Sequence, residues 1–122
     1  MKTSCYKSYK GNQGIGISLS SPNSWNGPMY NALAPSWNLL YSIKSGLIDQ
    51  TEYEKTYKEE VLEKLDPAKI YDELKDNVLL CWEMPEEFCH RRIVAQWLET
   101  ALNISVPEWN KDDNKIHSKK LW

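Results

Sequence analysis

A short apolar segment that leads directly into a cationic, amphipathic one limits the possible folds of this chain most. Residues 78–82 read Val-Leu-Leu-Cys-Trp, which is typical of a strand buried in a covered sheet. After a short loop, residues 89–92, Cys-His-Arg-Arg, begin a segment whose apolar positions keep helical spacing through Leu98. A buried strand that feeds a helix predicts an α/β protein: a small single-domain layered fold with a short, mostly parallel sheet flanked by helices.

The remaining segments fit the same architecture. We expect further strands over residues 2–6, 15–20 and 104–106, and helices that begin after Ser36, Asp49 and Asp66. Tyrosine and aliphatic residues recur at every fourth position from Tyr53 to Leu65, which indicates core packing rather than a cofactor wall. A chain of 122 residues has room for one α/β domain, expected over residues 1–109, before a polar tail over residues 110–122.

Composition excludes several classes of protein. A net charge of −2 argues against a general nucleic-acid binder, which needs a basic excess. No apolar run is long enough to span a membrane and no signal peptide is recognisable, so we expect a cytoplasmic protein, in the host cytoplasm if it is viral. The odd cysteine count (Cys5, Cys81 and Cys89) fits reduced thiols, and the cysteine and histidine spacing matches no zinc motif. We therefore expect neither a metal nor a cofactor.

The start of the last predicted helix has the features of an anion site. Unpaired backbone N–H groups and the helix dipole favour a phosphate or a carboxylate there, and arginines strengthen that preference. Successive helical positions point about 100° apart, so Arg91 and Arg92 cannot both face the ligand. We assign Arg91 to the ligand because it precedes apolar positions on the core side. The alternative is a surface pair that neutralises Glu86 or Glu87.

Other polar side chains are expected at the carboxyl ends of the strands, where parallel sheets bind ligands. Glu83 closes the buried strand, and hydroxyl groups lie in or after the two earlier strands. Trp25 lies in a loop between a proline and a glycine, where it either stacks on a base or caps the core. The expected ligand-binding residues are Thr3, Ser4, Ser18, Ser20, Trp25, Glu83, Cys89, His90 and Arg91.

Catalytic roles stay open for three of these residues. Cys89, at a helix start beside two arginines, is either an activated nucleophile or a small packed residue. It does not fit a phosphatase loop, because the sixth residue after it is Ala95 rather than arginine. His90 is either a general acid or base, or a structural group that donates to a backbone carbonyl. Glu83 is a candidate nucleophile or base.

Together these motifs resemble the domain-of-unknown-function family 488. The segments that carry the resemblance are Val78-Leu79-Leu80-Cys81-Trp82-Glu83, Phe88-Cys89-His90-Arg91 and Val94-Ala95-Gln96-Trp97-Leu98, with support from residues 3–6, 17–20, 33–35 and 65–67. The similarity spans most of the chain up to about Trp109. It implies a small cytosolic α/β protein of bacteria or their viruses, with a site around Ser4, Ser20, Glu83, Cys89, His90 and Arg91.

Three hypotheses about function follow. The first is a binding protein for a small anionic, nucleotide-derived ligand; for a phage protein, the resemblance extends this to sequestering a host immune nucleotide signal. The second is a hydrolase or transferase acting on a nucleotide or an N-glycosidic bond, with Glu83 as nucleophile or base, His90 as acid and Arg91 as phosphate clamp. The third is a protein-interaction module that docks through the Trp25 loop or through Leu121 and Trp122. We expect a homodimer.

Overall fold

The structure is a computed structural model that describes residues 1–83 and 87–110. The expected tail beyond residue 110 lies outside the described residues, as do residues 84–86. In the described part of the chain, no helix is both long enough and apolar enough to cross a membrane.

Three parallel strands form the sheet at the centre of the molecule. β3 (Val78–Cys81) lies between β1 (Lys2–Cys5) and β2 (Gly14–Gly16), which gives the strand order β1-β3-β2. All four residues of β3 are buried, as expected for a continuous apolar run paired on both sides. The predicted α/β class with a parallel sheet is confirmed.

Among residues 1–83 and 87–110, four α-helices complete the fold, three of them between β2 and β3 and the fourth after β3. Their bounds are α1 (Trp37–Lys44), α2 (Gln50–Glu60), α3 (Pro67–Leu74) and α4 (His90–Leu102), with short 3-10 turns at η1 (Asn31–Leu33) and η2 (Leu62–Lys64). The three expected N-caps are confirmed, because the side chains of Ser36, Asp49 and Asp66 each accept a hydrogen bond from a backbone N–H in the first turn.

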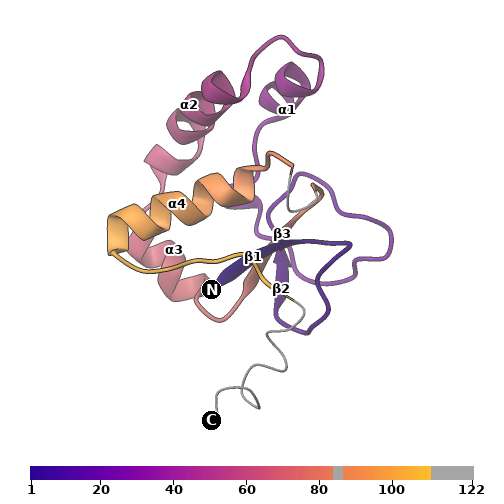
Figure 1. Cartoon of the computed structure of the whole chain (residues 1–122), viewed down its shortest axis with the longest axis vertical. Helices are drawn as coiled ribbons and strands as arrows, with labels where there is room; N and C mark the ends of the chain where they lie inside the picture. The colour runs from indigo at the N-terminus through magenta and orange to yellow at the C-terminus, as the bar shows by residue number, and fades with distance from the viewer. Residues whose placement is uncertain (84–86, 111–122) are drawn as a thin grey trace.

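Helices cover one face of the sheet, and loops cover the other. α4 passes across the helical face beside α3, and α1 and α2 lie above α4 in the view of Figure 1. Because side chains alternate along a strand, Leu79 points into the main core with Val94 of α4, whereas Leu80 points to the opposite face. There Leu80 packs in a smaller cluster with Tyr9 and Trp25.

β2 is shorter than the strand predicted over residues 15–20. Gly16 pairs with the loop that returns after it: its N–H donates to the carbonyl of Pro28, and its own carbonyl accepts from the N–H of Tyr30. The chain then leaves the sheet. Residues 18–20 therefore begin a loop at the carboxyl edge of the sheet, and this position brings them to the site described below.

The strand predicted over residues 104–106 does not form. α4 ends at Leu102, and the left-handed conformation of its C-cap Asn103 (φ 56°) turns the chain back toward the sheet. The chain reaches the edge of β1 only afterwards, where the N–H of Thr3 donates to Pro107 and the carbonyl of Thr3 accepts from Trp109. This contact is an isolated parallel bridge rather than a strand.

Candidate functional site

A pocket of about 350 Å³ lies at the carboxyl ends of β2 and β3. Its walls come from the loop after β2, from α1 and α2, and from the turn between β3 and α4. Its position is the edge at which parallel α/β sheets bind ligands, and its volume lies within the range of small-molecule sites. The expected site residues that line it are Ser18, Ser20, Glu83, Cys89 and His90.

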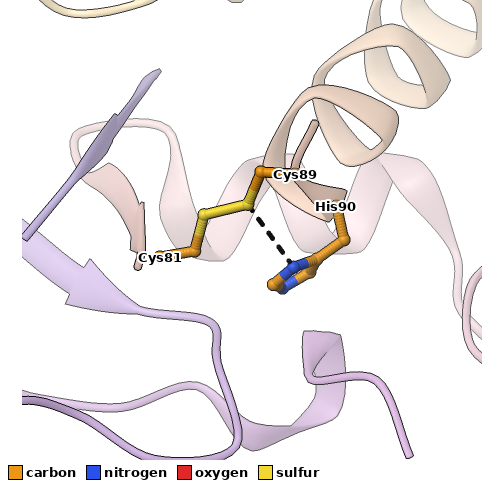
Figure 2. A group of neighbouring side chains, drawn as sticks. All are labelled: Cys81, Cys89 and His90. Carbon is orange, nitrogen blue, oxygen red and sulfur yellow. Dashed lines mark hydrogen bonds between the residues drawn. A yellow bond between two sulfur atoms is a disulfide. The ribbon is translucent and has the colours of Figure 1, made fainter. Parts of the chain in front are cut away.

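A disulfide joins two cysteines in the pocket wall, which corrects the expectation of three reduced thiols. Cys81 ends β3, Cys89 precedes α4, and the turn between them brings their sulfur atoms together (Figure 2). Cys5 is buried in β1, outside this pair. Because the disulfide form of Cys89 has no thiol, the nucleophilic role considered for Cys89 requires reduction.

Both ring nitrogens of His90 have a partner beside the disulfide. Nε2 lies 2.7 Å from the carbonyl oxygen of Ile17, and Nδ1 lies 3.7 Å from Cys89 Sγ. A carbonyl oxygen only accepts, so Nε2 carries the proton and Nδ1 keeps its lone pair. Burial lowers the pKa of His90, which keeps the imidazole neutral near pH 7. In this state Nδ1 is suited to act as a base or as a metal ligand, and His90 is a poor general acid.

An acidic and a basic side chain face each other in the pocket. Glu83 Oε1 lies 3.6 Å from Lys44 Nζ, and the two side chains are 21% and 63% exposed. Tyr53 lies in the same wall, where burial and the negative charge of Glu83 raise its pKa, so that its phenol stays protonated. Glu83 is therefore placed to accept hydrogen bonds from a ligand, and Lys44 is placed to contact an anionic group.

Arg91 does not line the pocket, which corrects its assignment as the ligand clamp. Its fully buried guanidinium forms a two-point ion pair with Glu108, with both N···O distances at 3.0 Å. Nη1 also donates to the backbone carbonyl of Glu83 at 2.7 Å and to Cys81 Sγ at 2.8 Å. Arg91 thus ties the end of β3, the start of α4 and the C-terminal segment together inside the protein.

Arg92 and Thr3 extend this set of internal contacts. Arg92 Nη1 donates to Thr3 Oγ1 at 2.8 Å, and Thr3 Oγ1 donates in turn to the carboxylate of Glu108. Thr3 and Ser4 are buried and do not line the pocket, contrary to expectation. We refer to Arg91, Arg92, Thr3 and Glu108 as the buried network.

Trp25 lies outside the pocket, so its position corresponds to the core-capping alternative. Its ring packs against Tyr6 at 5.7 Å on the loop-covered face of the sheet. Gly14 makes this possible, because a Cβ atom there would collide with the Trp25 ring. Trp82 lines the pocket instead, and its Nε1 donates to the carbonyl of Ser20 at 2.8 Å.

Sequence reasoning misses the helical wall of the pocket and the cluster beside it. Lys44 and Tyr53 are visible only as members of amphipathic helices, and the sequence does not show which helix face closes over the sheet edge. Cys81, Cys89 and His90 place their potential ligand atoms within 4.8 Å of one another. The spacing of these residues along the chain does not match a zinc motif, because they are brought together between a strand and a helix rather than within one short metal-binding loop.

Comparison with known proteins bears on the identity of the chain. No curated protein and no solved structure matches it. A family model, DUF488-N3a, described as the active DUF488-N3 subclade, matches residues 7–102. This range contains every residue that lines the pocket. The expected resemblance to family 488 is therefore confirmed, and the chain belongs to the DUF488-N3a family.

Proposed function

We propose that the protein binds a small nucleotide-derived ligand in the pocket. The position and lining of the pocket support this most: it lies at the carboxyl edge of a parallel sheet and combines charged, hydrogen-bonding and aromatic side chains. A nucleotide offers groups that match this lining, namely a planar base, a hydroxylated sugar and an anionic phosphate.

The base and the sugar each have suitable partners in the pocket lining. Tyr53 and Phe88 pack edge to face at 5.3 Å and form an aromatic surface against which a base can stack. Glu83 and Ser20 line the pocket at the sheet edge, where a carboxylate and a hydroxyl group can bond to sugar hydroxyls.

The anionic group of the ligand would contact Lys44 rather than Arg91. Lys44 is the one lysine or arginine among the described residues that line the pocket. α4 also begins in the pocket wall, so the positive end of its dipole faces the cavity. Because Glu83 and Glu87 share this lining, we propose a monophosphate rather than a polyphosphate as the ligand.

Binding without turnover is the form of this function that the geometry favours. The enzymatic hypothesis needs His90 as an acid and Arg91 as a phosphate clamp, but Nε2 of His90 is held by Ile17 and Arg91 is buried. In a phage, such binding would sequester a host immune nucleotide signal. We also propose a cytoplasmic location and a homodimer, and light scattering of the purified protein tests the second.

An enzyme is the second candidate, favoured by the description of the family as active. Glu83 lies in the same pocket as the neutral imidazole of His90, so the pocket contains a carboxylate and a potential base. The reaction would be hydrolysis or transfer at a nucleotide or its N-glycosidic bond, with Glu83 as nucleophile or base.

The test combines calorimetric titration with nucleosides and nucleoside monophosphates and chromatography of the same mixtures. Measurable binding that weakens about tenfold in Glu83→Gln, but not in the surface variant Lys58→Gln, supports the proposal. Recovery of intact ligand supports binding without turnover, and recovery of free base supports the enzyme. If none of the compounds binds or changes, both proposals are wrong.

A further inference from the structure

Three potential metal ligands meet on the sheet side of the pocket. The Sγ atoms of Cys81 and Cys89 and a ring nitrogen of His90 all lie within 4.8 Å of one another (Figure 2). We propose that reduction of the disulfide converts this cluster into a Zn²⁺ site with two thiolate ligands, one imidazole ligand and a fourth position open to the pocket. This inference does not depend on which small molecule the pocket binds.

The existing distances suit one tetrahedral ion. Zn–S bonds of about 2.3 Å and Zn–N bonds of about 2.0 Å place a sulfur and a nitrogen about 3.5 Å apart at the tetrahedral angle. Cys89 Sγ and His90 Nδ1 already lie 3.7 Å apart. The Cα atoms of Cys81 and Cys89 are 7.4 Å apart, so once the bond is broken the sulfurs have room to separate to the roughly 3.8 Å that two zinc thiolates require.

His90 is already oriented as a metal ligand. A metal-bound histidine usually donates its other ring N–H to a carbonyl or a carboxylate, which fixes the tautomer and the ring orientation. Nε2 of His90 makes this bond to the carbonyl of Ile17 at 2.7 Å, and the ring packs edge to face against Tyr57 at 5.4 Å. The lone pair of Nδ1 is thereby held toward the sulfur of Cys89.

The charges around the cluster also balance. Two thiolates neutralise one Zn²⁺ ion, and His90 contributes as a neutral imidazole. Arg91 Nη1 lies 2.8 Å from Cys81 Sγ and stabilises negative charge on that sulfur, while Glu108 compensates the charge of the guanidinium. The buried network thus supplies the outer-shell hydrogen bond that metal thiolates commonly receive.

The fourth coordination position would face the pocket. All three ligands line the pocket, and the group within 4.8 Å includes no carboxylate among the described residues. Three protein ligands with one open position is the arrangement of catalytic rather than structural zinc sites. A water molecule or an atom of the pocket ligand would take that position.

Formation of the site consumes a reductant and releases protons. Two molecules of a thiol reductant give two electrons and two protons to the Cys81–Cys89 disulfide and become a disulfide themselves, which leaves two cysteine thiols. Binding of Zn²⁺ then displaces one proton from each thiol. The oxidised chain cannot bind the ion in this way, because its sulfurs are bonded to each other.

The experiment uses Co²⁺ as a spectroscopic substitute for Zn²⁺ on the full-length chain. The chain is reduced with dithiothreitol, freed of reductant without oxygen and titrated, and a parallel oxidised sample is treated identically. We expect Co²⁺ binding at one equivalent to release two protons and to give thiolate-to-cobalt charge-transfer absorption with the intense visible bands typical of four-coordination. Zn²⁺ should then displace the Co²⁺ and abolish these bands without further release of protons. The oxidised sample should show none of these.

Variants assign the ligands. We expect Cys89→Ser and His90→Gln to weaken Zn²⁺ binding by at least about 100-fold, since loss of an outer-shell partner alone costs about 10- to 100-fold. Cys5→Ser removes a cysteine outside the cluster and should bind like the unmodified chain. Circular dichroism of each reduced variant shows whether it is folded. If Cys89→Ser does not fold, the Zn²⁺ affinity of His90→Gln alone tests the assignment of the ligands. The proposal is overturned if the reduced chain shows no thiolate–cobalt absorption, or if Cys5→Ser loses as much affinity as His90→Gln.

Discussion

The two sides of the start of α4 use their polar residues in different ways. On the pocket side, Cys89 and His90 face a cavity that also exposes Glu83 and Lys44. On the other side, the buried network pairs its guanidinium, hydroxyl and carboxylate groups with one another and with backbone carbonyls. The comparison teaches that arginines at the start of a helix do not by themselves mark a binding site, because Arg91 and Arg92 already have partners inside the protein.

One residue connects the two sides. Cys81 is bonded to Cys89 at the pocket, and its sulfur accepts a hydrogen bond from Arg91 of the buried network. Adjacent residues of α4 can serve both sides because each step along a helix rotates the side chain by about 100°. The buried network therefore contacts a sulfur atom in the pocket wall as well as the interior of the fold.

The largest expected effect on stability is the loss of the buried ion pair. Arg91→Met should lower the free energy of unfolding by about 3 kcal/mol. This value is at the lower end of the range for a broken buried ion pair, because 29% of the Glu108 side chain is exposed and water can solvate the carboxylate that remains. Lys58→Met, which breaks an exposed pair, should change it by less than about 0.5 kcal/mol. Urea denaturation measures both. A loss below about 1 kcal/mol in Arg91→Met would show that the network is not a structural anchor.

Reduction of the disulfide should have the next largest effect. In metal-free buffer we expect the free energy of unfolding to fall by about 2–3 kcal/mol, because the unfolded chain loses the short loop closed between Cys81 and Cys89. Urea denaturation with and without dithiothreitol measures this difference. Cys89→Ser should not respond to the reductant. Equal stability of the two forms of the unmodified chain would contradict the expectation.

Acid should destabilise the protein through His90. Burial holds the pKa of His90 below 6.5 in the folded state, whereas the unfolded chain takes up a proton near that pH. The contribution of His90 to stability is therefore constant above pH 6.5 and decreases below it, by up to about 1.4 kcal/mol per pH unit until the folded pKa is reached. Unfolding of His90→Gln should show a weaker pH dependence over this range, and parallel curves would argue against a buried neutral imidazole.

Among the pocket and network residues, the Lys44–Glu83 pair is expected to contribute least to stability. Lys44→Gln should change the free energy of unfolding by less than about 1 kcal/mol, because Lys44 is 63% exposed. The same variant should weaken binding of a nucleoside monophosphate and leave binding of the corresponding nucleoside unchanged. Calorimetry with the two compounds measures this, and equal losses for both would remove Lys44 as the phosphate contact.

Much of the fold can be predicted from local patterns. The caps at Ser36, Asp49 and Asp66 and the apolar run at β3 are short-range signals, and the structure confirms each of them. The last strand is predicted wrongly because Ile104 and Val106 are apolar and β-branched but do not pair in the sheet. Pairing with β1 depends on where the chain returns after α4, which is a tertiary property.

Prediction of the site is less complete for a related reason. Ser18, Ser20, Glu83, Cys89 and His90 are found because they lie at strand ends or at a helix start, and the parallel sheet brings these ends to one edge. Whether a polar group faces a cavity or an internal partner depends on distant residues. The partner of Arg91 is Glu108, 17 residues away along the chain, and no local pattern reveals it.

The most direct test of the central claim is to titrate ¹⁵N-labelled protein with a nucleoside 5′-monophosphate and follow the backbone amide resonances. We expect changes at residues 18–20, at Tyr53 and Glu83, and at residues 87–90, while Thr3 and Glu108 keep their shifts. Changes centred on Thr3 and Glu108, or no changes at a saturating concentration, would contradict the assignment of binding to the pocket side of α4.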